Sequence, residues 1–324
     1  MKKVLAVLLV LVLAVGTVIM LWEEESFHVN NTTKTKTSDN NIDFIEFKIE
    51  GSSPSTQAPV VTDNSPQVRV EDEKELSCHE KYQQQPEWKE IEAILSSIYM
   101  NGEEAAGQGV YQRMPIESLR SYAESGDPNA MFHYGSALMW KGSVGIYLNY
   151  PGEVERTINA DKYKNMYKHH KPDLEVIKQG SDYLYRSAVK GKLGAFMENA
   201  FMQQATVRRM NKDDFDFSEE HKLTLLASSM ANFKLMAYVH ENDEFLAEVI
   251  NYEYFTSKLL DELYPEKEQK EETLKKLNSQ VARLYQTKKS QWISDRNYHG
   301  LPVQPQLFNP RLESFYIEHI KVCE

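Results

Sequence analysis

The chain has 324 residues, with 37 Lys and Arg against 48 Asp and Glu, so its formal net charge is −11. The acidic balance argues against nucleic-acid binding, which needs a basic surface. The 14 Gly and 12 Pro are too few for a low-complexity or collagen-like chain. Mean hydropathy is −0.56, yet the first 22 residues are almost entirely apolar. The sequence thus divides into an apolar start and a long water-soluble remainder.

The apolar start predicts a membrane anchor. As a helix, residues 4–22 measure about 28 Å, close to the ~30 Å hydrocarbon core of a bilayer. Two lysines precede this run and three glutamates follow it, which predicts a signal-anchor at 1–22 with its N-terminus in the cytoplasm. The alternative is a cleaved signal peptide, with its apolar region at 4–13 and a cleavage site at 14–16.

Both interpretations send the remainder of the chain across a membrane. The short leader, and the lack of any other long apolar run, favour a bacterial periplasmic protein. With an uncleaved anchor, the chain is expected to be a single-pass inner-membrane protein with its bulk in the periplasm. With a cleaved leader, it is expected to be soluble in the periplasm or secreted.

The only two cysteines, Cys78 and Cys323, both fall on the expected outer side. In an oxidising compartment such a pair indicates a candidate disulfide. The bridge would close a loop of about 245 residues, for which chain entropy sets a ceiling of about 5 kcal/mol. The alternative is two buried free thiols.

Residues 23–76 read as a flexible polar linker, because stretches rich in Asn, Ser, Thr and Pro bury too little apolar area to offset their ordering entropy. Two strand-like interruptions, 42–49 and 68–70, predict either transient extended structure, a small hairpin, or an added strand on a partner's sheet. From Cys78 onward, apolar residues recur at helical spacing, starting with a helix after Pro86.

Two segments of the helical part share the pattern Ala-x-x-Gly-x-x-x-Ala. A glycine at this point ends one helix in the left-handed conformation, and the second alanine lies where the next helix packs. The residues are Ala123, Gly126 and Ala130, and then Ala188, Gly191 and Ala195. In the first copy Asp127 caps the next helix and Pro128 begins it. A third, degraded copy is expected at Ser229, Asn232 and Met236, with Asn232 in the turn.

This pattern resembles the Sel-one-like repeats, which are relatives of the tetratricopeptide repeats. Residues 121–130 match the family's helix end and its Gly-Asp/Asn turn, and Gly135 and Gly142 match its second helix. The resemblance covers about residues 116–240, although the second copy has Glu-Asn-Ala-Phe at 198–201 in place of the family's Leu-Gly element. It implies an adaptor built from helix pairs, and some relatives are periplasmic immunity proteins that block secreted toxins.

The predicted fold is therefore an all-α domain at 77–324, behind the anchor and the linker. We expect a short α/α solenoid of stacked antiparallel helix pairs with a C-terminal helical cap. The cap is an amphipathic helix over 266–293, for which a coiled-coil seam is the alternative. A last helix is predicted to start at Asn309 and Pro310.

A search for chemistry finds no zinc, calcium, phosphate-loop or serine-hydrolase motif, and we expect no metal or cofactor. His169 and His170 are expected on a solvated surface, because neighbouring helix residues point about 100° apart. The acidic stretch 213–221 lacks the glycine and final glutamate of a calcium loop. It predicts a helix start instead, with Ser218 as the cap and acidic residues in the first turn.

A tyrosine-rich insertion between the repeats is the candidate partner-binding segment, because such insertions often lie on a binding face and Tyr is enriched at interfaces. Its alternative is a loop packed on the solenoid. The candidate residues are Tyr147, Tyr150, Tyr163 and Tyr167. The expected function is a membrane-tethered, non-catalytic periplasmic module that binds a protein or peptide. The alternatives are an immunity protein against an exported toxin or enzyme, and a cell-wall hydrolase, for which no catalytic constellation is visible.

Overall fold

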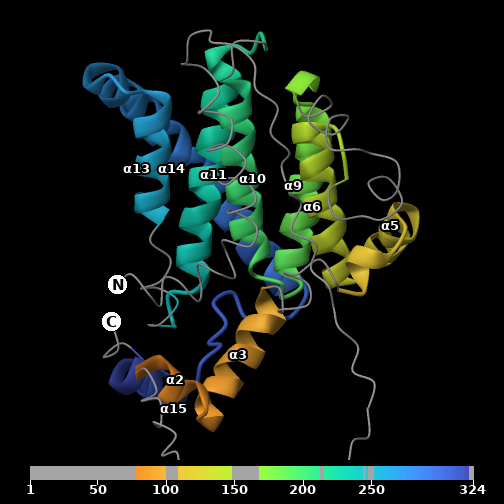
Figure 1. The fold of residues 1–324 in the computed structure, drawn as a ribbon, viewed down its shortest axis with the longest axis vertical. Helices are drawn as coiled ribbons and strands as arrows, with labels where there is room; N and C mark the ends of the chain where they lie inside the picture. Colours follow the sequence, from red (N-terminus) through yellow and green to blue (C-terminus); the bar gives the residue numbers. More distant parts are fainter. Residues whose placement is uncertain are drawn as a thin grey trace, which may run out of the picture.

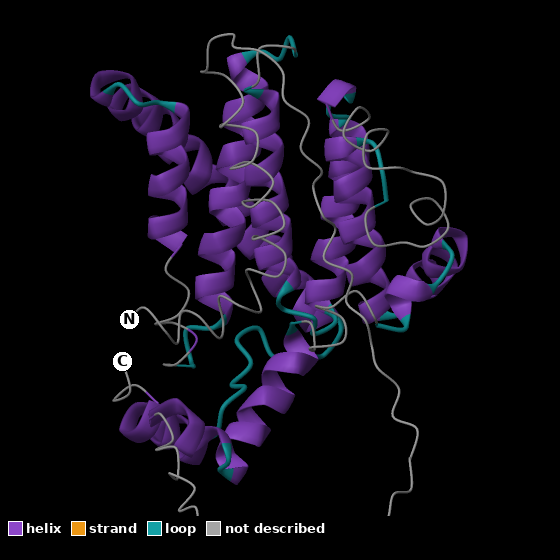
Figure 2. Ribbon diagram, viewed as in Figure 1, coloured by secondary structure: helices purple, strands orange, loops and turns teal. Residues whose placement is uncertain are grey.

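The computed structural model describes residues 78–99, 109–147, 168–211, 215–243, 246 and 252–320. Within these ranges all regular elements are helical (Figure 2). Their bounds are α2 Cys78–Gln83, α3 Pro86–Ile98, η1 Tyr111–Arg113, α5 Ile116–Ser125, α6 Pro128–Val144, α9 Leu174–Val189, α10 Ala195–Met210, α11 Glu219–Val239, α13 Tyr252–Leu263, α14 Lys267–Tyr298, α15 Pro310–Phe315 and the π-helical turn η2 Tyr316–Ile320. The all-helical prediction is confirmed for this part of the chain.

None of the described helices is both long and apolar enough to cross a membrane. The predicted anchor at 1–22 and the predicted linker at 23–76 lie outside the described residues.

Successive helices stack side by side, as a solenoid-like array. Figure 1 shows α13, α11, α10, α9, α6 and α5 in sequence across the molecule, with α14 running behind them. Helix α5 packs on α6, α6 on α9, α9 on α10 and α10 on α11. Helices α2, α3 and α15 form a group at the lower end of the array.

Three helix starts predicted from the sequence are confirmed. The carboxylate of Asp127 accepts a hydrogen bond from the Ala130 backbone N–H at 2.9 Å, directly before Pro128 begins α6. Ser218 caps α11 and Asn309 caps α15 in the same way. Each cap satisfies a backbone donor that has no partner inside its helix.

The two predicted glycine turns have left-handed backbones. Gly126 ends α5 with φ of 101°, and Gly191 follows α9 with φ of 115°. At the end of α5 the Asp127 N–H donates to the Tyr122 carbonyl at 3.2 Å, which closes the helix with one of its own free acceptors. The four alanines of the two copies are fully buried, and they are Ala123, Ala130, Ala188 and Ala195.

The third repeat copy was predicted wrongly. Asn232 lies in the middle of α11, a continuous helix of 21 residues, where it is buried and donates to the Gln203 side-chain carbonyl at 3.3 Å. The stretch contains neither Gly nor Pro, so nothing in it ends a helix, and the spacing alone was not sufficient.

Helices α6 and α9 approach each other through glycines at their closest point. A Cβ atom on Gly135 would lie 2.9 Å from the Gly180 carbonyl oxygen, and one on Gly180 would lie 2.7 Å from the Gly135 oxygen. A Cβ on Gly142 would lie 2.6 Å from a side-chain carbon of Ile177. Since real Cβ atoms do not come this close, a larger residue at these positions would push the two backbones apart.

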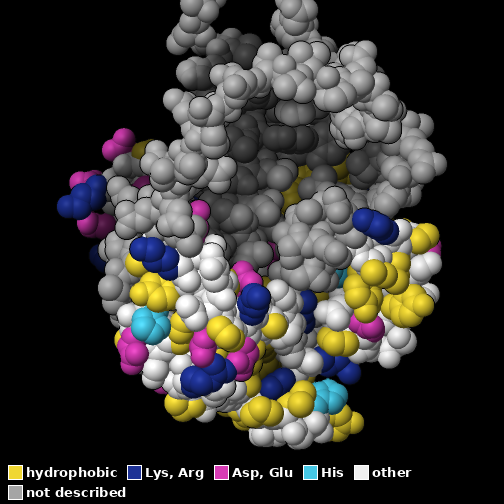
Figure 3. All heavy atoms as spheres, turned by 60° about the horizontal axis from the view of Figure 1, so that its bottom comes forward, with side chains coloured by type: hydrophobic (Ala, Val, Ile, Leu, Met, Phe, Trp, Pro, Cys, Tyr) yellow, Lys and Arg dark blue, Asp and Glu magenta, His cyan; other side chains and the backbone are white. Residues whose placement is uncertain are grey.

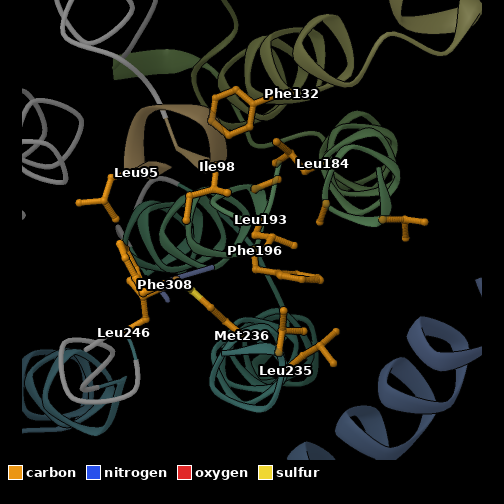
Figure 4. Packing of buried hydrophobic residues seen from close by; sticks show 14 of the residues in the cluster. Leu95, Ile98, Phe132, Leu184, Leu193, Phe196, Leu235, Met236, Leu246 and Phe308 are labelled. Atoms are coloured by element: carbon orange, nitrogen blue, oxygen red, sulfur yellow. The ribbon is translucent and has the colours of Figure 1, made fainter. Parts of the chain in front are cut away.

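The main core lies where the lower ends of the stacked helices meet α3. Figure 4 shows side chains from α3, α6, α9, α10 and α11 converging there. Nearly all of them are buried, among them Phe132, Leu184, Phe196, Met236 and Phe308. A second cluster joins α11, α13 and α14, and a third joins α5 and α6.

Helix α14 packs on the domain and does not expose a coiled-coil seam. Its apolar residues Leu277 and Val281 are buried in the cluster with α11 and α13. Near its end the Tyr185 hydroxyl of α9 donates to Asp295 at 2.8 Å, and Arg296 donates to the Val189 carbonyl at 2.8 Å. The helix therefore joins α11 to α9, which are not neighbours in the array.

The lower group brings α2 against the end of the described chain. Tyr82 of α2 stacks on His319 of η2, with ring centroids 5.0 Å apart. Cys78 begins α2, and η2 ends three residues before Cys323, which lies outside the described residues. The packing brings these two regions together, and the pairing of the two cysteines stays a prediction.

Gly135→Ala and Gly180→Ala should each lower the free energy of unfolding, by up to about 2 kcal/mol. Alanine favours a helix by about 1 kcal/mol over glycine, but overpacking a tight contact costs about 1–3 kcal/mol. The opposing atoms here are backbone, which yields little, so the cost exceeds the gain. Urea unfolding of the full-length protein measures the difference. Exposed Ser290→Ala on α14 is the control, expected within about 0.5 kcal/mol of wild type, and a stabilised glycine variant would contradict the close approach.

Reduction should lower the thermal unfolding midpoint of the wild-type protein, because it removes a bridge whose stabilisation by chain entropy is at most about 5 kcal/mol. Cys78→Ser should have the lower midpoint from the outset and should not respond to dithiothreitol. Non-reducing electrophoresis gives a second readout, because an intramolecular bridge makes the unfolded chain migrate faster. Equal mobility of wild type and variant would show that no such bridge forms.

Candidate interaction surface on helices α5, α6 and α9

Tyrosine rings and basic side chains gather along one side of α5, α6 and α9. We call this surface the tyrosine–cation strip. Figure 3 shows hydrophobic side chains on the right of the molecule, where α5 lies, with basic and acidic side chains beside them. The strip consists of Arg120 from α5, Tyr134 and Lys141 from α6, Tyr147 just after α6, and Tyr183, Arg186 and Lys190 at the end of α9.

Ring contacts hold the centre of the strip. The rings of Tyr134 and Tyr183 meet edge to face, with centroids 4.9 Å apart. The Arg186 guanidinium lies 5.1 Å from the centre of the Tyr183 ring, and the Lys141 ammonium lies 5.0 Å from that of Tyr147. Such arrangements place positive charge over the negative face of a ring, where it is attracted by the quadrupole.

Helical spacing brings the strip residues to one side. On α9, Val176, Tyr183 and Arg186 follow at intervals of seven and three residues, so their side chains share a face. On α6, Tyr134 and Lys141 are also seven residues apart. Val176 and Tyr183 pack against the same apolar cluster of α5 and α6 that contains Tyr134.

Burial dominates the electrostatics at Tyr134. It raises the pKa of the phenol to about 12, although Arg120 opposes this by favouring the charged form. Arg120 also makes an ion pair with Glu124 at 2.8 Å. Both partners are about half exposed, so this pair contributes little to stability. At neutral pH the phenol is therefore a hydrogen-bond donor in a mildly basic setting.

The lower end of the strip is basic as well. The Lys190 ammonium comes within 3.6 Å of the point where a Cβ on Gly126 would lie, beside the turn that ends α5. Neither Arg186 nor Lys190 forms an ion pair within the described ranges, and no hydrogen bond of the Tyr134 or Tyr183 hydroxyl is seen there either. The strip thus offers donors and ring faces, and these are groups that recognise a ligand rather than react with it.

Of the four tyrosines predicted to bind a partner, Tyr147 is part of the strip. Tyr150, Tyr163 and Tyr167 lie outside the described residues. The sequence interpretation missed Tyr134, Tyr183 and Arg186. A helical projection of α9 would have found the last two, because they fall on one face with Val176.

The two neighbouring histidines differ in their surroundings. His169 is exposed, as expected. His170 is partly buried, because its ring lies over Gly145 and its Nε2 is 3.1 Å from the Gly142 carbonyl oxygen. Among the described residues, no three His, Cys, Asp or Glu side chains come together in a way that could hold a metal ion.

Two buried polar clusters elsewhere hold helices and loops together. Ser136 donates to Glu198 at 2.6 Å between α6 and α10, and burial raises the pKa of Glu198. Asp243 accepts from the backbone N–H groups of Leu307 and Phe308 at 2.9 and 3.1 Å, which fastens the segment before α15 to the end of α11. These contacts satisfy polar groups inside the fold.

No protein-family model matches this chain, and no curated protein and no solved structure is found to be similar to it. Its function must therefore be argued from its own residues.

The stability of the Tyr134→Phe variant should increase relative to that of wild type as the pH rises from about 9 to about 11. An unfolded tyrosine ionises near pH ~10, while folded Tyr134 keeps its proton to about pH 12. The stabilising effect of this proton is complete below the unfolded value and is lost as the pH climbs towards the folded one. Phenylalanine has no such proton. Urea unfolding at both pH values measures the change.

The control is Tyr122→Phe on α5, whose side chain is 51% exposed. Its stability difference from wild type should be the same at both pH values. A Tyr134→Phe difference that is equally constant would show that Tyr134 is not shielded from solvent in the folded protein.

Proposed function

We propose that the chain is a membrane-tethered, non-catalytic interaction module of the bacterial periplasm, which binds a protein or peptide partner on the tyrosine–cation strip. The observation that carries the proposal is the strip itself. Three helices contribute rings and cations to it, and the donors of Tyr134, Tyr183 and Arg186 have no acceptor within the described ranges. Tyrosine and arginine are the side chains most enriched where proteins bind each other.

The stacked helices support this proposal. Arrays of helix pairs present long surfaces that bind partners and rarely catalyse. The turns at Gly126 and Gly191 occur where the resemblance to Sel-one-like repeats expects them. An adaptor role is what that resemblance implies.

The proposed location rests on the sequence, namely on its apolar start and its two cysteines. The apolar run at 4–22 has the length and the flanking charges of an anchor. A disulfide between Cys78 and Cys323 would fit an oxidising compartment such as the periplasm, since cytosolic thiols are kept reduced.

Site-specific photo-crosslinking in living cells tests the proposal. A benzophenone amino acid replaces Gln179, which is exposed and lies between Val176 and Tyr183 on the strip face of α9. We expect one dominant crosslinked protein, in the membrane fraction, when the full-length chain is produced in a bacterium that encodes it. External protease should digest the domain in spheroplasts and spare it in intact cells.

Exposed Lys275 on α14 is the matched control position, because it is equally accessible and far from the strip in sequence. The same crosslinks from Gln179 and Lys275, or none from Gln179, would refute a specific partner at the strip. Recovery of the chain from the cytosol after lysis without detergent would refute the tether.

A further inference from the structure

We infer that the partner of the tyrosine–cation strip is an acidic segment of a protein, bound in extended conformation. The inference rests on the proposed function and adds the chemistry of the ligand. It follows from charge, from hydrogen-bonding capacity and from length, which are taken in turn.

The strip is basic on an acidic protein. The chain has a net charge of −11, yet Arg120, Lys141, Arg186 and Lys190 all belong to this one surface. The carboxylates beside it are Glu117, near the Tyr134 phenol, and Glu124, which pairs with Arg120. Exposed Asp182 lies one turn before Arg186 on α9. A positive strip on a negative molecule orients and selects negatively charged partners.

Arg186 and Lys190 are the strip residues that most clearly favour an acidic ligand. They are exposed, they lie one turn apart near the end of α9, and no carboxylate pairs with either one within the described ranges. A carboxylate in front of them would accept charge-assisted hydrogen bonds, which are stronger than neutral ones. A basic or neutral partner would leave both cations without an acceptor.

The two tyrosine hydroxyls of the strip could donate to further acceptors on the ligand. The hydroxyls of Tyr134 and Tyr183 make no hydrogen bond within the described ranges, and the partly exposed ring of Tyr183 offers an apolar surface. An extended peptide presents free backbone carbonyls and alternating side chains to such a surface. A helical partner would not, because its carbonyls are already paired inside the helix.

The length of the strip sets the size of the segment. From Val176 to Lys190 along α9 is about 21 Å at the helical rise of ~1.5 Å per residue. An extended chain covers this distance with about six residues, at ~3.3 Å each. With alternate side chains facing the strip, about three of them contact it, so the segment needs two or three acidic residues on that side.

Fluorescence anisotropy with the purified full-length protein tests the inference. The probe is a fluorescein-labelled peptide of about eight residues in which Glu and Val alternate, compared with the same peptide carrying Gln or Lys in place of Glu. We expect the Glu peptide to bind at least about tenfold more tightly than the Gln peptide, and the Lys peptide not to bind. Raising the salt concentration from about 0.05 M to about 0.5 M should weaken the binding, because salt screens exposed charges.

A matched pair of charge reversals locates the binding site. Arg186→Glu combined with Lys190→Glu should weaken binding of the Glu peptide at least about tenfold. Lys275→Glu combined with Arg283→Glu on α14 changes the net charge equally, and its binding should stay within about twofold of wild type. Tyr183→Leu, which leaves the charge unchanged, should also weaken binding. Unfolding midpoints equal to that of wild type show that the variants are folded. Arg186→Lys, which keeps the positive charge, should retain part of the affinity that Arg186→Glu loses.

Several results would overturn the inference. Equal binding of the Glu and Gln peptides would remove the acidic requirement, and equal losses in the two charge-reversal variants would show non-specific attraction. Binding of a labelled oligothymidine, in the absence of binding by the Glu peptide, would assign the strip to another class of polyanion. A crosslink from Gln179 without peptide binding would retain the proposed function and reject the acidic ligand. Peptide binding without a cellular crosslink would retain the acidic ligand and reject the proposed cellular partner.

Discussion

The close approach of α6 and α9 is the contact on which the rest of this structure depends. Gly135 and Gly180 face each other so tightly that neither position has room for a methyl group. Because the backbones nearly touch there, the residues beside the glycines are brought into contact as well. Tyr134 precedes Gly135 and Tyr183 lies three residues after Gly180, and their rings meet at 4.9 Å. The glycines therefore assemble the candidate binding surface as well as the helix pair.

The same approach organises the core beneath it. With α6 and α9 held together, Phe132 and Leu184 face α3 and α10 from neighbouring helices, and the main apolar cluster forms between them. Helix α5 then needs only a short turn, through Gly126 and Asp127, to pack on the other side of α6. The helix packing and the residues of the turn thus favour the same arrangement. Such consistency between local and global preferences favours a uniquely folded state.

Local features of this fold could be predicted from the sequence, because each depends on a few neighbouring residues. The caps at Asp127 and Ser218 and the turns at Gly126 and Gly191 are of this kind. The misplaced third repeat shows the limit, since Asn232 matched a spacing but lacked any residue that ends a helix. The strip lay beyond the reach of the sequence for another reason. Its members come from three helices, and only the packing of α6 on α9 brings them to one surface.

Helix α14 links two helices that do not neighbour each other in the array. In a simple solenoid each unit contacts only its neighbours. Such an array can therefore bend and can unfold from one end, unit by unit. Here one helix is fastened to α11 and, through Asp295 and Arg296, also to α9. Separating α9 from α11 would therefore also break contacts with α14. The relative position of α9 and α11 therefore depends on α14 as well as on the stacking of neighbouring helices.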